Sequence, residues 1–186
     1  RSEMLSGISH DLRTPLTRIK LQLAFIKDKE ITNKLSRDVD EMEKMLNEYL
    51  QFTSSSYLEK NEEFNISDLI NNVIEKYNNK NISKNIPLNI YINGRKNLIK
   101  RCINNLIDNA IKYGDKVDIE IKKTNNNLFI NIEDNGPGIP KNEFENVFKP
   151  FYKIDKGRAE TKSSVGLGLS IASDVIKSHG GNINLD

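Results

Sequence analysis

The sequence has little of several residues that define other classes of protein. It contains one cysteine, two histidines, five prolines and no tryptophan in 186 residues. The single Cys102 excludes an intrachain disulfide, and with His10 and His179 as the only histidines a zinc site is not expected. No apolar run approaches the roughly 20 residues of a membrane-spanning helix. The first residues do not form the pattern of a signal peptide.

An excess of charge of one sign is also lacking. The 28 basic and 26 acidic residues are mixed along the chain and leave a formal net charge of +2. No concentrated basic patch therefore predicts a nucleic-acid partner. Apolar residues make up 37% and charged residues 29% of the chain, which is typical of a globular protein. We expect no nucleic-acid partner and no direct membrane contact by this part of the chain.

The first fifty residues carry two apolar stripes at helical spacing. The first stripe comprises Leu5, Ile8, Leu12, Leu16, Ile19, Leu23 and Ile26. After a polar break at residues 28–30, the second comprises Leu35, Val39, Met42, Leu46 and Tyr49. This predicts a helical hairpin whose stripes are half covered, so a homodimer forming a four-helix bundle would bury them. The alternative is a monomer whose hairpin docks on its own second domain.

His10 lies off the first stripe, beside Asp11 and four residues before Thr14. Positions four apart share a helix face, so the Thr14 hydroxyl is within reach of a group attached to the imidazole. An adjacent acid can orient one ring nitrogen while the other attacks an electrophile. Pro15 removes a backbone hydrogen bond and predicts a bend beside His10. The alternative is an ordinary solvated histidine.

The pattern changes after residues 53–56, a Ser/Thr segment interpreted as a linker. Strands are predicted at residues 63–66, 88–92, 117–121 and 128–132, with helices at 67–77, 97–113 and 169–178. Ser67 is expected to begin one helix, and His179 to cap the end of another. The order predicts one sheet with helices on one face, and a further strand beginning just before Asp186. The fold class is α+β, with a hairpin domain at 1–56 and an α/β sandwich at 57–186.

The helix predicted over residues 97–113 has a polar face. Asn105, Asn109, Lys112 and Tyr113 fall within an arc of about 100°, largely opposite the apolar residues. An amide oxygen is a suitable ligand for Mg²⁺, and Lys112 supplies positive charge for a phosphate. A solvated polar face is the alternative.

Two glycine-rich segments follow. Asp134 ends a strand and can accept a hydrogen bond from an exocyclic amine, while Gly136 and Gly138 permit close approach of a flat ring such as adenine. The segment from Gly166 to Leu169 opens a helix, whose N-terminal N–H groups can hold a triphosphate. Each segment alone also fits a bare turn.

A charged segment separates these two glycine-rich turns. It contains Lys153, Lys156 and Arg158 and is interpreted as a mobile lid. Phe148 and Phe151 flank a proline at its base.

Five ordered motifs resemble those of the transmitter core of bacterial sensor histidine kinases. They are the H-box around His10, the N-box at 105–113, the G1-box at 134–138, the F-box at 148–151 and the G2-box at 166–168. Residues 9–19 are similar in particular to the EnvZ-like osmosensor group. The resemblance covers nearly the whole chain. It implies a dimeric hairpin followed by an ATP-binding domain of the gyrase, Hsp90, histidine kinase and MutL type, truncated at its C-terminal end.

The resemblance also implies residue roles in the hairpin. His10 accepts the γ-phosphoryl group of ATP, Asp11 acts as its base or orienting acid, and Thr14 positions water for dephosphorylating the partner. The phosphoryl group then moves to an aspartate of a response-regulator receiver domain. The fragment is expected to be cytoplasmic, with its parent protein in the bacterial inner membrane.

In the second domain the resemblance implies that Asn109 holds Mg²⁺, supported by Asn105. Asp134 recognises adenine, and Lys112 and Tyr113 face the nucleotide. The other implied nucleotide contacts are Gly136, Gly138, Ile139, Phe148, Lys153, Arg158, Gly166, Leu167, Gly168 and Leu169. We expect domain rotation, rather than the chemical step, to control the rate.

The chain departs from the family pattern at two places. Lys153 stands where relatives often carry arginine, and it offers a point charge instead of a bidentate fork. Residues 163–165, Ser-Ser-Val, replace the usual glycine and threonine before Gly166, which predicts a stiffer lid hinge.

Three alternative functions remain from the sequence. One is a non-catalytic dimeric scaffold that binds ATP as a conformational signal. Another is a gyrase, Hsp90 or MutL relative, although those proteins lack the His10 hairpin. The third is a member of the same family in which phosphatase activity through Thr14 dominates.

Overall fold

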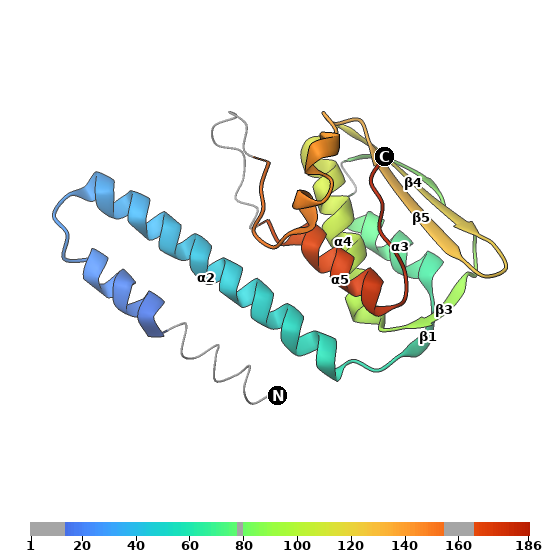
Figure 1. Ribbon diagram of the computed structural model, residues 1–186, viewed down its shortest axis with the longest axis horizontal. Helices are drawn as coiled ribbons and strands as arrows, with labels where there is room; N and C mark the ends of the chain where they lie inside the picture. Colours follow the sequence, from blue (N-terminus) through green and yellow to red (C-terminus); the bar gives the residue numbers. More distant parts are fainter. Residues whose placement is uncertain (1–13, 78–79, 155–165) are drawn as a thin grey trace. The chain divides into compact units, whose positions relative to one another are not determined.

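A computed structural model describes residues 14–77, 80–154 and 166–186 (Figure 1). It divides into two compact units, one built on the hairpin up to Leu58 and the other on most residues from Glu59 onwards. Three predicted site residues, His10, Asp11 and Arg158, lie outside the described residues. None of the described helices is long and apolar enough to cross a membrane.

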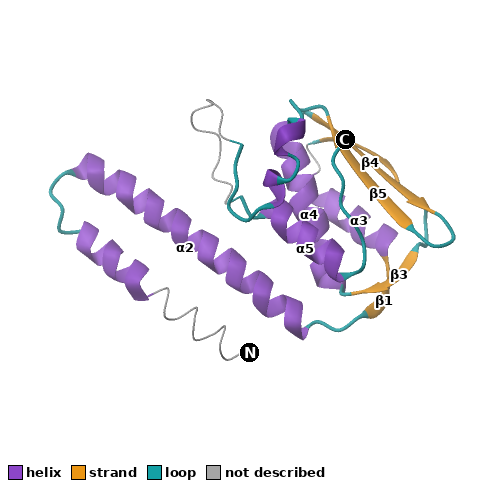
Figure 2. Cartoon of the chain, in the orientation of Figure 1, coloured by secondary structure: helices purple, strands orange, loops and turns teal. Residues whose placement is uncertain are grey.

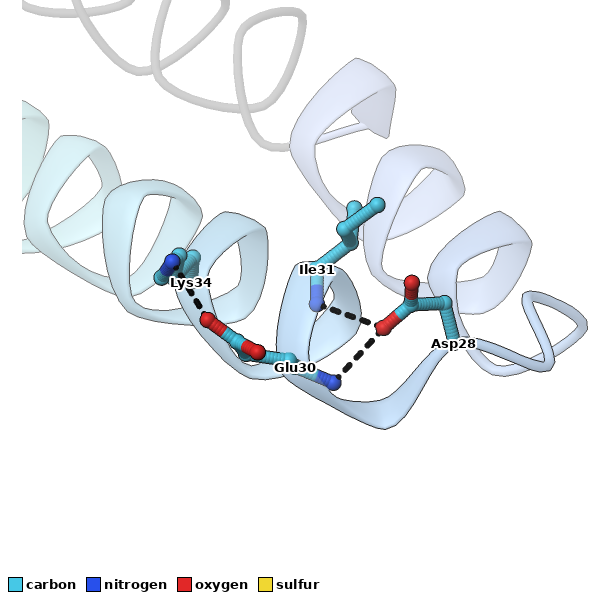
Figure 3. Close-up of polar contacts among 4 residues, drawn as sticks. All are labelled: Asp28, Glu30, Ile31 and Lys34. Atoms are coloured by element: carbon cyan, nitrogen blue, oxygen red, sulfur yellow. Dashed lines mark hydrogen bonds and ion pairs between the residues drawn. The ribbon is translucent and has the colours of Figure 1, made fainter.

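The first unit is a pair of helices. The described part of the first helix covers residues 14–23, and α2 spans Lys29–Leu58. Asp28 caps α2, because its Oδ1 accepts the N–H groups of Glu30 at 2.9 Å and Ile31 at 3.1 Å (Figure 3). Residues 29 and 30 therefore already belong to α2, and the break between the two helices covers residues 24–28 instead of the predicted 28–30.

The predicted linker at residues 53–56 is wrong, because α2 continues through it to Leu58. Serine and threonine disfavour a helix by only about 0.5 kcal/mol each relative to alanine. That cost is too small to end a long helix where no proline or glycine follows. The helix therefore runs directly to Glu59, the first residue of the second unit.

The hairpin has a small core. Leu16, Leu23 and Val39 are buried, and Leu46 packs against them. Lys20 Nζ joins the two helices by ion pairs with two carboxylates of α2, Asp40 Oδ1 at 2.7 Å and Glu43 Oε2 at 2.5 Å. Half of the described side chains of each apolar stripe lie outside this core. The exposed apolar side chains are Ile19, Leu21, Phe25, Ile26, Ile31, Leu35 and Met42.

The second unit packs helices on one face of a three-stranded sheet (Figure 2). Its order is β2 (Asn81–Asn85), β4 (Lys116–Lys123) and β5 (Leu128–Asp134), with β2 parallel and β5 antiparallel to β4. Successive side chains of a strand alternate between faces, so the apolar residues of β4 form one buried row. These are Val117, Ile119 and Ile121. The predicted β4–β5 hairpin is confirmed, whereas β2 was not predicted.

A separate antiparallel pair joins β1 (Glu62–Asn65) to β3 (Tyr91–Gly94). The described residues therefore form two sheets, not the single sheet predicted. β3 begins later than residue 88, because Asn89 has a φ of +60° and interrupts the extended backbone.

The helix that follows β1 is capped by a different residue from the one predicted. Asn65 Oδ1 accepts the N–H of Ser67 at 3.0 Å, and α3 spans Ile66–Ile74. Ser67 is buried and donates its hydroxyl to the Pro87 carbonyl at 2.6 Å. The last predicted turn of the helix is a 3₁₀ turn, η1 (Glu75–Tyr77).

The two long helices of the second unit are α4 (Lys96–Tyr113) and α5 (Gly168–Ser178), which pack against each other (Figure 1). Both are confirmed predictions. Cys102 is fully buried on α4, and burial raises the pKa of its thiol to about 12, so this thiol stays protonated. The strand predicted just before Asp186 is absent, since residues 181–186 pair with no described strand.

His179 connects the C-terminal end of α5 to the residue that precedes α4. Its Nε2 accepts the Arg95 N–H at 3.0 Å, so Nδ1 carries the proton and donates to the Val175 carbonyl at 2.7 Å. The predicted cap of α5 is thus present, and the same ring also holds the residue before α4.

Candidate functional site

The polar face predicted on α4 is present in the structure. Asn105, Asn109 and Lys112 are half-buried, and Tyr113 is exposed. The opposite face of α4 is buried against the rest of the unit. Its buried residues are Leu98, Ile99, Cys102, Ile103, Ile107 and Ala110. Packing of the apolar face thus fixes the orientation of the amides.

The middle of α4 meets the beginning of α5. A Cβ on Gly168 would lie 3.8 Å from the Cβ of Asn105. Asn105 Nδ2 is the one side-chain polar atom in the described part of the chain that is buried without a hydrogen-bond partner. A buried donor without a partner is costly. An anionic oxygen placed between this amide and the N-terminal N–H groups of α5 would satisfy both.

The segment before α5 contains a glycine in a backbone conformation that other residues rarely adopt. Gly166 has a φ of +75°, a left-handed conformation that favours glycine. Leu167 is buried and Leu169 is half-buried. Gly168, the last residue of the G2-box, lies beside Asn105 of the N-box.

The C-terminal end of α4 meets the turn after β5. A Cβ on Gly136 would lie 2.7 Å from the Tyr113 carbonyl oxygen and 2.5 Å from Asp134 Oδ1, so only glycine fits there. The Gly136 N–H donates to Asp134 Oδ1 at 2.8 Å. Gly138 has a φ of +71°, and Ile139 is half-buried. The Asp134 side chain is exposed beside the end of α4, where it can accept a hydrogen bond from an amine.

These two meeting points define the length of the site. Asn105 and Tyr113 are eight residues apart, which corresponds to about 12 Å along the helix axis. An acceptor for an amine lies at one end and donors for an anion at the other. This arrangement suits an extended nucleoside triphosphate.

The residues between the two ends fit a magnesium ion held beside phosphates. Asn109 lies one turn from Asn105 on the same face and offers a neutral amide oxygen, a ligand type that Mg²⁺ accepts. Lys112 Nζ lies 4.9 Å from the ring centroid of Tyr113, so its positive charge is at the same face.

The F-box segment is held by a carboxylate that the sequence did not indicate. Tyr152 donates its hydroxyl to Glu143 Oε2 at 2.5 Å, and Asn146 Nδ2 donates to the same oxygen at 3.1 Å. The Tyr152 pKa is raised, chiefly because its hydroxyl donates to this carboxylate. The segment includes η2 (Lys141–Glu143) and η3 (Asn146–Phe148). The network therefore fixes the base of the segment interpreted as a lid.

The two phenylalanines of the predicted F-box differ in burial and in backbone conformation. Phe148 is half-buried at the end of η3, and Phe151 is exposed with a φ of +64°. Lys153 is exposed. In the hairpin, Thr14 is exposed at the first described position.

The N-terminus of α4 is capped by a residue that is distant in sequence. The Glu59 carboxylate accepts the N–H of Asn97 at 2.5 Å and of Leu98 at 3.1 Å. Glu59 follows the last residue of α2, so the start of the second unit is tied to the helix that carries the amides. No local pattern signals this contact.

The fold and the site together define a class of proteins in which a helical hairpin precedes an ATPase-type domain. Two family models match this chain. Residues 1–57 match the His Kinase A (phospho-acceptor) domain, and residues 94–186 match the histidine kinase-, DNA gyrase B- and HSP90-like ATPase. The chain therefore belongs to the sensor histidine kinase family, of which it has the transmitter core.

Individual proteins agree with this assignment. The chain is 31% identical over its whole length to the sensor histidine kinase GtrS of Pseudomonas aeruginosa, of which it spans 39%. It is 29% identical over its whole length to the sensor histidine kinase WalK of Bacillus subtilis, of which it spans 34%. The assignment to the EnvZ-like group stays a prediction.

Solved structures share the fold. Full-length ShkA in complex with AMPPNP matches 97% of this chain and 42% of that protein, with a TM-score of 0.66 and 20% identity. The histidine kinase AdeS of Acinetobacter baumannii matches 91% of this chain and 86% of that one, with a TM-score of 0.57 and 24% identity.

Proposed function

We propose that this chain transfers the γ-phosphoryl group of ATP to His10 and then to an aspartate of a response-regulator receiver domain. An imidazole nitrogen attacks the γ-phosphorus, the bond to the bridging oxygen breaks, and ADP leaves. Asp11 orients the ring or accepts its proton, and Thr14 positions a water molecule that hydrolyses the phosphorylated aspartate of the partner, releasing inorganic phosphate. The polar face of α4 supports this proposal, together with the segments at its two ends, because candidate anion donors and the candidate amine acceptor Asp134 lie about 12 Å apart along this helix.

The second unit holds the nucleotide in this proposal. Asp134 accepts from the adenine amine, and Asn105 with the N-terminus of α5 donates to the phosphates. Asn109 would hold Mg²⁺, which neutralises the charge that develops on the phosphate oxygens. Lys112 adds positive charge and Tyr113 covers the base. The reaction then depends on positioning, because phosphoryl transfer needs little covalent help from the protein.

The hairpin holds the acceptor and joins two copies of the chain. Its exposed apolar side chains, among them Phe25 and Met42, are the reason to expect burial against a second hairpin in a four-helix bundle. We place the parent protein in the bacterial inner membrane, with this part in the cytoplasm. The partner is a receiver domain that docks on the hairpin.

Incubation with magnesium and γ-labelled ATP tests this function. The wild-type chain should acquire an acid-labile, base-stable label that a purified receiver domain then removes. His10→Gln should bind ATP with unchanged affinity and remain unlabelled. A wild-type chain that binds ATP but acquires no label would instead support the ATP-binding scaffold.

A further inference from the structure

Asn135 joins two segments on which the adenine end of the site depends. Its side-chain Oδ1 accepts the N–H of Asp115 at 2.8 Å and of Lys116 at 2.9 Å. Its backbone N–H donates to the Lys116 carbonyl at 3.2 Å. These three hydrogen bonds connect the residue after β5 to the turn that links α4 with β4. One side chain therefore fixes the distance between the end of α4 and the end of β5.

Asp134 lies inside this junction. A Cβ on Gly114, the residue after α4, would lie 2.8 Å from Asp134 Cβ and 3.1 Å from Asn135 Oδ1. On its other side the Gly136 N–H holds Asp134 Oδ1 at 2.8 Å. The Cβ of Asp134 thus lies close to Gly114, where there is no room for a larger residue, and its carboxylate is held by the N–H of Gly136. Loss of the Asn135 contacts would release the first of these two restraints.

We propose that Asn135 is a positioning residue that sets the Asp134 carboxylate and thereby the preference of the site for a 6-amino purine over a 6-oxo purine. This inference rests on the proposed function, in which Asp134 accepts from the adenine amine. A 6-oxo purine presents a carbonyl oxygen at that position, which a carboxylate repels. A displaced carboxylate would lose the hydrogen bond to the amine of a 6-amino purine. It would also repel the carbonyl oxygen of a 6-oxo purine less strongly.

A turn residue with a merely structural role would behave differently. Its removal would lower the stability of the unit and weaken the binding of both kinds of purine nucleotide equally. The ratio of the two affinities therefore separates positioning of Asp134 from general support of the fold. The acceptor oxygen is the atom that matters, because all the side-chain contacts of Asn135 are accepted and none is donated.

Calorimetric titration of the full chain with ATP and with inosine triphosphate tests this inference. The wild type should prefer ATP. In Asn135→Leu, which has a similar shape and no acceptor, the ratio of the two dissociation constants should fall about tenfold, mostly through weaker ATP binding. Asn135→Asp keeps an acceptor at the same place and should retain a ratio within about threefold of wild type. Asn131→Leu, an exposed position on β5, is the matched control.

Each outcome of the titration decides a different point. If the wild type binds both nucleotides equally or neither, adenine recognition by Asp134 fails, and with it the proposed site. If the wild type prefers ATP but Asn135→Leu weakens both nucleotides alike or neither, the inference about Asn135 is overturned. Should Asn135→Leu fail to fold, Asn135→Ala replaces it. Loss of the preference in Asn135→Asp overturns the inference with either variant.

Discussion

The two units of this chain bury their apolar side chains to very different extents. In the second unit Ile66 and Ile107 are 0% exposed, whereas in the hairpin Phe25 is 86% and Met42 is 52% exposed. Side chains of this size each stabilise a fold by about 1.5–3 kcal/mol when they are fully buried. Among the described residues, the second unit therefore has the larger buried core, while the hairpin exposes more of its large apolar side chains.

We relate this difference in burial to the different functions proposed for the two units. A nucleotide site needs side chains held in fixed positions, and the packed core around α4 provides them. In our proposal the hairpin carries a reactive histidine and surfaces for a second copy and for a receiver domain. Apolar residues that remain exposed in one chain are the expected mark of such surfaces. The predictions below test whether nucleotide binding belongs to the second unit and assembly to the hairpin.

The largest effect is expected at Asn109. Asn109→Ala removes the proposed magnesium ligand, which is worth several kcal/mol in phosphoryl transfer and so lowers labelling by about 100-fold or more. Labelling from γ-labelled ATP measures this, and light scattering should show an unchanged dimer. Asn104→Ala is the matched control, because Asn104 Nδ2 bonds only the Lys100 carbonyl of its own helix. Equal labelling in the two variants would contradict the role of Asn109.

A proline at residue 54 tests the continuity of α2 between the units. Ser54→Pro breaks a helix interior at a cost of about 3 kcal/mol and should reduce labelling at least about tenfold. The dissociation constant for ATP should stay nearly unchanged, because Asn105, Asn109 and Asp134 all lie in the second unit. Ser54→Ala, which favours a helix, should label like the wild type. Full labelling of the proline variant would show that the continuous helix is not needed.

The dimer is tested by a charge on the exposed face of the hairpin. Met42→Glu should raise the dimer dissociation constant about 10- to 100-fold, since it replaces about 1.5–3 kcal/mol of apolar burial with a desolvated carboxylate. Analytical ultracentrifugation measures the change. Leu88→Glu introduces the same charge at an even more exposed apolar residue of the second unit and should leave the dimer intact. If both variants dissociate alike, the hairpin is not the interface.

A smaller effect is expected at the turn of the hairpin. Asp28→Ala removes the cap of α2 and should lower the free energy of unfolding of the hairpin by about 1 kcal/mol. Chemical denaturation followed by circular dichroism detects this. Asp38→Ala changes an exposed acid within the same helix and should have little effect. A smaller loss at residue 28 than at residue 38 would contradict the capping role of Asp28 (Figure 3).

The smallest effect is expected at Tyr77, whose hydroxyl donates to Asp108 Oδ1 on α4 at 2.6 Å. Burial and then this hydrogen bond raise the Tyr77 pKa. The folded state therefore favours the neutral phenol, so its stabilisation is complete below the unfolded pKa of about 10 and is lost as pH rises above it. Tyr77→Phe should cost about 1 kcal/mol or less at pH 7.

Urea denaturation of the wild type and Tyr77→Phe at neutral and at strongly alkaline pH checks this sign. The difference in unfolding free energy between the two chains should shrink as pH rises. A difference that grows with pH would mean that the folded state favours the ionised phenol.

The sequence predicted the elements whose pattern is local and strong. The helix of α4 and the hairpin of β4 and β5 have many apolar residues at one period, and the structure confirms them. β2 was missed because Asn81–Asn85 contains a single apolar residue and is held by parallel pairing with a distant strand. The linker was wrong because weak helix formers were treated as helix breakers.

The candidate site also contains residues that the sequence predicted and residues that it did not. Asn105, Asp134 and Gly168 were found because they stand in ordered motifs, and their elements meet in the structure. Glu59 and Asn135 were not given roles, because the groups that they bind are about 20 or more residues away in the chain. Hydrogen bonds of this kind leave no periodic signal in a sequence. Geometry is needed to find the residues that support a site, whereas motifs find those that face the ligand.

In our proposal, the second unit supplies a phosphoryl group to the imidazole of His10 on the hairpin. Peptide mapping by mass spectrometry, after incubation with magnesium ATP and with magnesium ADP as the control, tests it most directly. We expect one added phosphoryl group on the His10 peptide, dependent on ATP and located on the ring. Phosphate on a serine or threonine, or none in a chain that binds ATP, would contradict it.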